Sequence, residues 1–267
     1  MASHGWVAAG SIMDALPGGV MRVLVLGGTT EASRLAKALS ARSDIVATLS
    51  LAGRTEAPAA QPIPTRIGGF GGVEGLARHL RDEAIGVLVD ATHPFAAQIS
   101  KNAAEAARAT ATPIVAFVRP PWTRETGDRW IDVESLDAAA RAIGETPRRV
   151  LLTTGRLGLP AFEAAPQHHY LVRTIDHPGD LPGLPDHTLL LDRGPFDLAA
   201  ERDLMVRERI DVVVTKNSGG SATRPKMVAA RELGLPVIVV QPPVRPDVPQ
   251  VHDVEGVFAF IEKARAP

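Results

Sequence analysis

Short runs of aliphatic and β-branched residues alternate with helix-forming stretches along the chain, and this alternation limits the possible folds more than any other feature. The expected strands are 23–26, 45–49, 87–90, 114–117, 150–152, 170–173, 188–191, 212–215 and 237–240. The expected helices are 30–41, 73–84, 95–109, 135–143, 197–209 and 221–233. Because parallel strands need crossover helices, the alternation predicts an α/β fold with mainly parallel sheets.

The pattern of the first half of the chain returns in the second half. RVLVLGG, GVLVDATHPF and TPIVAF correspond in order to RRVLLTTG, DVVVTKNSGG and LPVIVV. We therefore predict two Rossmann-like domains with a cleft between them, over 21–120 and 135–267. The segment 121–134 is rich in Pro, Trp and charge and would be the linker, with an edge strand near 130–133. Residues 1–20 are expected to be a disordered leader or an addition left from cloning, outside the fold.

Composition excludes several classes of protein. The 267 residues carry a net charge of −1, which argues against a nucleic-acid binder or a protein of acidic membrane surfaces. No apolar run reaches the length of a membrane span. The absence of cysteine excludes disulfides, thiolate metal sites and a cysteine nucleophile, and it is compatible with the cytoplasm, where we expect the protein. The histidines lack the spacing of a zinc pair, so no metal is expected. The oligomeric state stays open, with a monomer favoured.

Two glycines end the first expected strand, and a helix begins directly after them. Gly27 and Gly28 allow a ligand to approach the backbone closely, and Thr29 or Thr30 can cap the helix. The free N–H groups of such a helix start bind phosphate, so we count these four residues, with Glu31, as cofactor-binding candidates. The usual Gly-x-Gly-x-x-Gly spacing is absent, and a plain βα turn remains the alternative for this motif alone.

The end of the second expected strand bears on which dinucleotide binds. An NAD-binding protein usually has Asp or Glu at this place, to hold the ribose 2′-hydroxyl. Here Ser50 and Arg54 follow the strand, and Glu56 is the first acid. A hydroxyl and a cation suit a 2′-phosphate, so the sequence favours NADP(H) over NAD(H). The alternative for Arg54 is a solvated loop cation.

The segment DATHPFA, 90–96, closes the third strong strand. Asp90 and Thr92 lie at the strand end, where a cofactor crossing the sheet would arrive, and Pro94 fixes the turn into the next helix. Thr92 is a cofactor-binding candidate. Asp90 and His93 are candidates for proton transfer, although a single histidine beside a turn is more often structural.

The second half offers a cluster of cations and hydroxyls after its strands. Arg156 follows a glycine turn in TTGRLGLPAF, and the stretch TKNSGGSATRPK covers 215–226. Glycines with hydroxyls and cations at a strand end suit an anion-binding pocket, and the alternative is a solvated basic loop. The further candidates for binding an anionic substrate are Lys216, Asn217, Ser218, Gly219, Ser221, Arg224 and Lys226. Lys216 is also a candidate for proton transfer.

Four stretches together carry a resemblance to a known family. They are LVLGGTTEASRLAKAL (24–39), LAGRT (51–55), VDATHPFAAQISKNAAEAA (89–107) and KNSGGSATRPKMVAARELGLPVIVV (216–240). In this order they resemble the precorrin-6A reductases of cobalamin biosynthesis, and the resemblance covers essentially the whole chain from Met21. The glycine turn is then this family's own form of a dinucleotide site.

The resemblance implies a two-domain NADPH-dependent oxidoreductase without metal or flavin. Its substrate would be precorrin-6A, reduced at the C18=C19 double bond to precorrin-6B. The many carboxylates of this macrocycle suit a cleft lined by Arg and Lys. Two alternatives stay open: a cobalt-precorrin-6A reductase of the anaerobic pathway, and a non-catalytic protein that binds NADPH and tetrapyrrole.

Overall fold

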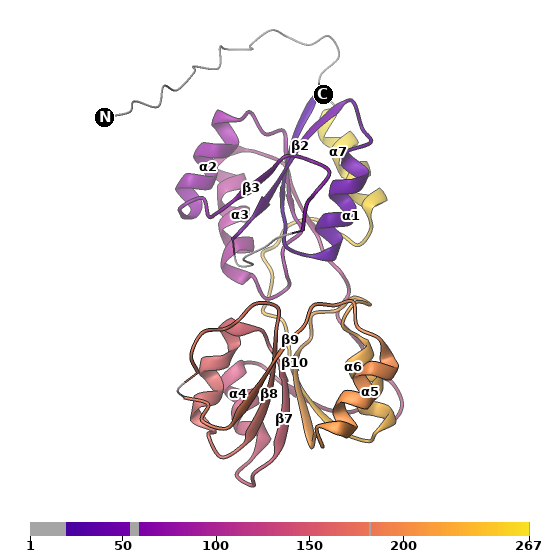
Figure 1. Cartoon of the computed structure of the whole chain (residues 1–267). Coiled ribbons are helices and arrows are strands. Elements are labelled where there is room, and N and C mark those ends of the chain that lie inside the picture. Colours follow the sequence, from indigo (N-terminus) through magenta and orange to yellow (C-terminus); the bar gives the residue numbers. More distant parts are fainter. Residues whose placement is uncertain (1–19, 54–58, 182, 267) are drawn as a thin grey trace, which may run out of the picture.

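The structure, a computed structural model, describes residues 20–53, 59–181 and 183–266. It contains two units, each a six-stranded parallel sheet with helices on both faces (Figure 1). The predicted α/β fold with two Rossmann-like units is thereby confirmed. Arg54 and the expected leader up to residue 19 lie outside the described residues. Within the described ranges, no helix combines the length and the apolar character that crossing a membrane requires.

The first sheet has the strand order β12-β5-β4-β1-β2-β3. Its strands are β1 (Met21–Leu26), β2 (Ile45–Leu51), β3 (Thr65–Ile67), β4 (Val87–Asp90), β5 (Ile114–Phe117) and β12 (Gln250–Val251). Helices α1 (Thr30–Leu39) and α7 (Val254–Arg265) cover one face, and α2 (Gly72–Asp82) and α3 (Ala97–Thr110) cover the other (Figure 1). Val23 and Val25 pack on the α1 side, whereas Leu24 packs on the α2 side. Both faces are buried, which explains the unbroken apolar run of β1.

The second sheet repeats this arrangement in the order β6-β11-β10-β7-β8-β9. Its strands are β6 (Arg129–Val133), β7 (Arg149–Thr153), β8 (His169–Thr174), β9 (His187–Leu191), β10 (Val212–Lys216) and β11 (Pro236–Val240). On one face lie α4 (Leu136–Ile143) and the 3₁₀ helix η1 (Arg156–Ala164), and on the other α5 (Leu198–Arg207) and α6 (Pro225–Glu232). The carboxyl ends of β7, β8 and β10 lie at one edge, where ligands of open α/β sheets bind.

Each sheet has one edge strand, β12 or β6, that comes from the stretch of chain following the other sheet's strands. β6 follows β5 along the chain but pairs with β11, with Trp130 opposite Val237. In return, β12 follows β11 but pairs with β5, with Gln250 opposite Ala116. The chain therefore passes twice between the units, and the edge strand expected in the linker belongs to the second sheet. The expected second domain, 135–267, needs correction at its C-terminal end, because Val257 and Ile261 of α7 are buried in the core of the first unit.

Candidate functional site

A cavity of about 160 Å³ lies at the carboxyl ends of β1, β2 and β4. Gly27, Ser50 and Thr92 line it, together with the glycine-rich loop 68–72 that follows β3. A Cβ atom at Gly27 would lie 2.6 Å from Leu49 Cδ1, so a larger residue there would displace the core. The cavity brings three of the expected cofactor-binding residues together.

Gly28 and the glycines of the loop expose their backbone. A Cβ atom on Gly28 would meet no atom within 4 Å, and the same holds for Gly68, Gly69, Gly71 and Gly72. Gly28 has φ +111°, a value that side-chain-bearing residues rarely adopt. Open space above two adjacent glycine turns fits a ligand that contacts main-chain N–H groups.

The first turn of α1 is fixed from two sides. Thr29 is the N-cap: its Oγ1 accepts a hydrogen bond from Ala32 N (3.1 Å) and donates one to Ala91 O (2.8 Å). This ties the start of α1 to the end of β4. Of the expected cofactor residues, Gly28, Thr29, Thr30 and Glu31 belong to this turn beside the cavity and do not line it.

Arg66 of β3 was missed by the sequence reasoning. Its Nη1 donates to Ser50 Oγ (2.9 Å) and to Gly68 O (2.8 Å), and its guanidinium lies 3.8 Å from the centre of the Phe70 ring. Arg66 therefore places a positive charge beside Ser50, where a cation was expected from Arg54. The only signal in the sequence was a cation in a segment too short to show a strand pattern.

Asp90 is engaged by its neighbours. One carboxylate oxygen accepts hydrogen bonds from Thr92 N (3.1 Å) and Thr92 Oγ1 (2.6 Å), and the other pairs with Arg245 Nη2 (3.2 Å). Its side chain is 3% exposed and lines neither cavity described here. The geometry favours Asp90 as a residue that positions Thr92 over a role in proton transfer.

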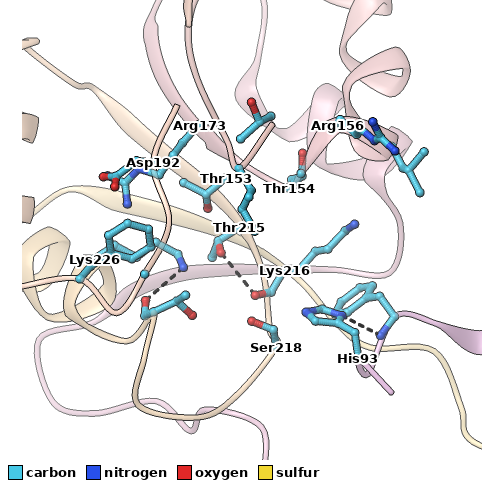
Figure 2. A pocket seen from close by; sticks show the side chains of 18 of the residues that line it. His93, Thr153, Thr154, Arg156, Arg173, Asp192, Thr215, Lys216, Ser218 and Lys226 are labelled. Atoms are coloured by element: carbon cyan, nitrogen blue, oxygen red, sulfur yellow. Dashed lines mark hydrogen bonds between the residues drawn. The ribbon is translucent and has the colours of Figure 1, made fainter. Parts of the chain in front are cut away.

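A second, larger cavity of about 420 Å³ lies at the carboxyl ends of β7, β8 and β10 (Figure 2). His93 and Phe95 of the first unit also line it, so both units contribute to one site. The lining cations are Arg156, Arg173, Lys216 and Lys226. Asp176 and Asp192 also line the cavity. Four basic side chains against two acidic ones form a lining that suits an anionic ligand.

His93 and Lys216 lie where the two units meet. The Lys216 ammonium is 5.3 Å from the centre of the Phe95 ring, a contact between β10 and the segment before α3. His93 Nδ1 accepts the Phe95 N–H at 3.2 Å (Figure 2), so a neutral His93 ring carries its proton on Nε2. Two of the three candidates for proton transfer, His93 and Lys216, thus line the same cavity.

Lys226 is buried at the side of this cavity. It donates to Thr223 O (3.1 Å), and its ammonium lies 4.9 Å from the Trp122 ring. Burial lowers the pKa of Lys226 to about 7; the nearby Glu201 opposes this shift, and Arg173 and Arg119 add to it. Arg173 itself forms a buried ion pair with Glu201 at 2.7 Å.

The cation-rich stretch 215–226 divides into two parts with different contacts. Lys216, Ser218 and Lys226 line the cavity, and so does Arg156 from the turn after β7. Asn217, Gly219, Ser221 and Arg224, also expected to bind substrate, are not among the lining residues. Asn217 accepts a hydrogen bond from Trp122 N (2.8 Å) and donates one to Trp122 O (3.1 Å), and Arg224 pairs with Glu125. Asn217 and Arg224 thus hold the connector between the units through their side chains.

The fold and the two cavities define a two-domain α/β protein of the dinucleotide-binding class, with a cationic second site. Residues 22–262 match the family model described as Precorrin-6x reductase CbiJ/CobK. The chain belongs to this family, which is one of oxidoreductases, and the resemblance seen in the sequence is confirmed.

Individual relatives agree with the family assignment. Precorrin-6A reductase of Rhodobacter capsulatus is 51% identical, over 90% of this chain and 95% of its own length. The Sinorhizobium sp precorrin-6A reductase is 49% identical, over 97% and 99%. A solved structure described as CobK precorrin-6A reductase superposes with a TM-score of 0.88 at 49% identity, covering 92% of this chain and 98% of that one. Cobalt-precorrin-6A reductase of Priestia megaterium is 30% identical, over 83% and 90%.

Proposed function

We propose that this protein reduces precorrin-6A to precorrin-6B with NADPH. When bound, NADPH would supply a hydride from C4 of its nicotinamide ring. One carbon of the C18=C19 double bond takes the hydride and the other takes a proton, so the products are precorrin-6B and NADP⁺. The observation that carries the proposal is the cationic cavity shared by the two units, in a chain about half identical to precorrin-6A reductases.

The cofactor is assigned to the first unit. The start of α1, capped by Thr29, offers N–H groups to the pyrophosphate, and the open glycine turns let it approach. Ser50 and Arg66 supply a hydroxyl and a cation for the 2′-phosphate, with Arg54 as a further candidate. Thr92, held by Asp90, lines the same cavity further along the sheet.

The macrocycle is assigned to the cationic cavity. Its carboxylates are suited to the guanidinium groups of Arg156 and Arg173 and to the ammonium groups of Lys216 and Lys226. Positive charge here also stabilises the electron density that a hydride brings to the ring. His93 and Lys216 remain candidates for delivering the proton, and Lys226 is added to them, because each lines this cavity.

The cobalt-free substrate is favoured over the cobalt-bearing one. The precorrin-6A reductases are about half identical to this chain, whereas the Priestia megaterium cobalt-precorrin-6A reductase is 30% identical. The experiment is to follow NADPH oxidation and the macrocycle's absorption spectrum with each form of the substrate. Turnover with precorrin-6A that requires NADPH supports the proposal. Turnover with the cobalt form alone would replace the substrate, and binding of both ligands without turnover would replace the function.

A further inference from the structure

The connector after β5 is fastened to the loop that follows β10. Arg119 Nε donates to Ser218 O at 2.5 Å, and Trp122 Nε1 donates to Gly220 O at 2.7 Å. At Gly219, which has φ +66°, a Cβ atom would lie 2.2 Å from Pro120 O, so only glycine fits the approach. With the paired hydrogen bonds of Asn217, these contacts fix the course of the chain as it leaves the first unit.

Arg119 also reaches back to the helix beside the cofactor cavity. Its Nη1 lies 3.0 Å from Glu31 Oε2, and the two side chains are 15% and 9% exposed. Glu31 belongs to the first turn of α1, two residues after the Thr29 cap. One guanidinium thus joins the start of α1 to the loop after β10, whose Ser218 lines the cationic cavity together with Lys216 at the end of that strand.

The chemistry of this bridge favours a fixed geometry. A guanidinium is planar and its donors have fixed directions, so contacts through Nε and Nη1 set the direction of both partners. Little water reaches the pair, so it is screened less than a surface ion pair. Glu31 has a second cationic neighbour, Arg34, at 3.5 Å, but the Arg34 side chain is 63% exposed and both residues belong to α1.

We infer that Arg119 is a positioning residue for the reaction, which holds the cofactor helix and the substrate loop in the register that hydride transfer needs. Glu31, expected from the sequence to bind cofactor directly, acts in this inference through Arg119. The inference rests on the proposed function, because it requires one ligand in each cavity.

Arg119→Gln tests the inference, with Arg34→Gln as the matched control that removes the other cation near Glu31. We expect kcat to fall by about tenfold to a hundredfold in Arg119→Gln, while the KM values stay within about threefold, because misplacement by about an ångström slows the reaction without removing a ligand contact. With NADPH deuterated at C4, the isotope effect on kcat should rise, since hydride transfer becomes slower than the other steps. Arg34→Gln should have the same kcat, KM values and isotope effect as the unaltered protein. An unchanged kcat and isotope effect in folded Arg119→Gln would overturn the inference.

Glu31→Gln keeps the test decisive if Arg119→Gln does not fold. It preserves an oxygen acceptor but removes the charge, and it should shift kcat and the isotope effect in the same direction. Glu31→Gln kinetics equal to those of the unaltered protein would count against the bridge.

Amide hydrogen exchange separates this inference from the proposed function, because it needs no turnover. NADP⁺ alone should slow exchange in residues 217–221 of the unaltered protein and of Arg34→Gln, but not of Arg119→Gln. If the unaltered protein shows this protection but does not reduce precorrin-6A, the coupling through Arg119 is supported and the proposed function is wrong. If NADP⁺ binds and 217–221 are unaffected in the unaltered protein, the bridge is wrong whatever the activity.

Discussion

The Lys226 ammonium lies between the Thr223 carbonyl and the Trp122 ring, and its side chain is almost fully removed from solvent. Burial lowers its pKa from 10.5 to about 7. The folded protein therefore releases this proton near pH 7, a pH at which the unfolded chain still holds it. Below pH 7 both states carry the charge, and the folded state bears the full desolvation cost. As pH rises from about 7 to 10.5, the unfolded state holds more protons, and this cost declines.

Lys226→Met should therefore change stability in a pH-dependent way. The gain in the free energy of unfolding of the variant over the unaltered protein should be greatest below pH 7. This gain should decline between about pH 7 and 10.5, because the unaltered protein becomes more stable as its buried Lys226 loses the proton. The free energy of unfolding, measured with denaturant across this range, checks the prediction. A difference that is the same at every pH would show that the Lys226 pKa is not lowered.

Arg66→Gln should weaken the binding of NADPH more than the binding of NADH. Loss of one charge-assisted contact to a 2′-phosphate costs about 1.5–3 kcal/mol, which is roughly a tenfold to hundredfold rise in the KM for NADPH. Arg22→Gln is the matched control, because Arg22 lies near the opposite end of the sheet and pairs with Glu83. Equal effects of Arg66→Gln on both cofactors would remove Arg66 from the 2′-phosphate site.

These residues also show where sequence reasoning ends at this scale. Gly27, Ser50 and Thr92 could be predicted, because each follows a clear strand and strand ends share one edge of the sheet. The contact of Arg66 with Ser50 could not, since β3 is too short to show a strand pattern. The pairing of Arg119 with Glu31 could not either, since 88 positions separate the two residues and the contact exists only after folding.

At the scale of elements, the nine strands and six helices expected from apolar runs and helical spacing are all present, apart from shifts at their ends. The strands that sequence reasoning missed are β3 and β12, which have three and two residues and are largely exposed, too short for any periodicity. The sequence also did not predict which sheet β6 and β12 would join. Either edge of two similar sheets could accept either strand, and local pattern does not choose between them.

The C-terminal helix α7 contributes to the first unit mainly through buried side chains. Ile261→Ala should lower the free energy of unfolding by about 2–5 kcal/mol, because Ile261 is fully buried and its loss leaves a cavity. Lys263→Ala, at an exposed position of the same helix, should change it by less than about 0.5 kcal/mol. Denaturant unfolding of both variants checks this. A small loss for Ile261→Ala would mean that α7 is only loosely attached to the first unit.

At the scale of the whole molecule, each unit follows the same strand plan but presents a different site. The first offers glycine turns and a helix start, and the second offers cations, with His93 and Phe95 reaching across to it. The chain crosses twice between the units, so their relative position is set by two connectors and by the Arg119 bridge. This arrangement suits a reaction in which two large anionic ligands must meet.

The most direct test of the account is a single turnover of the purified protein with precorrin-6A and NADPH carrying two deuterium atoms at C4. We predict that the reduced macrocycle is one mass unit heavier than the product formed with unlabelled NADPH, because the hydride passes directly from the nicotinamide to the ring. A reduced product without deuterium would contradict direct transfer. No reduction of intact precorrin-6A would contradict the proposed function itself.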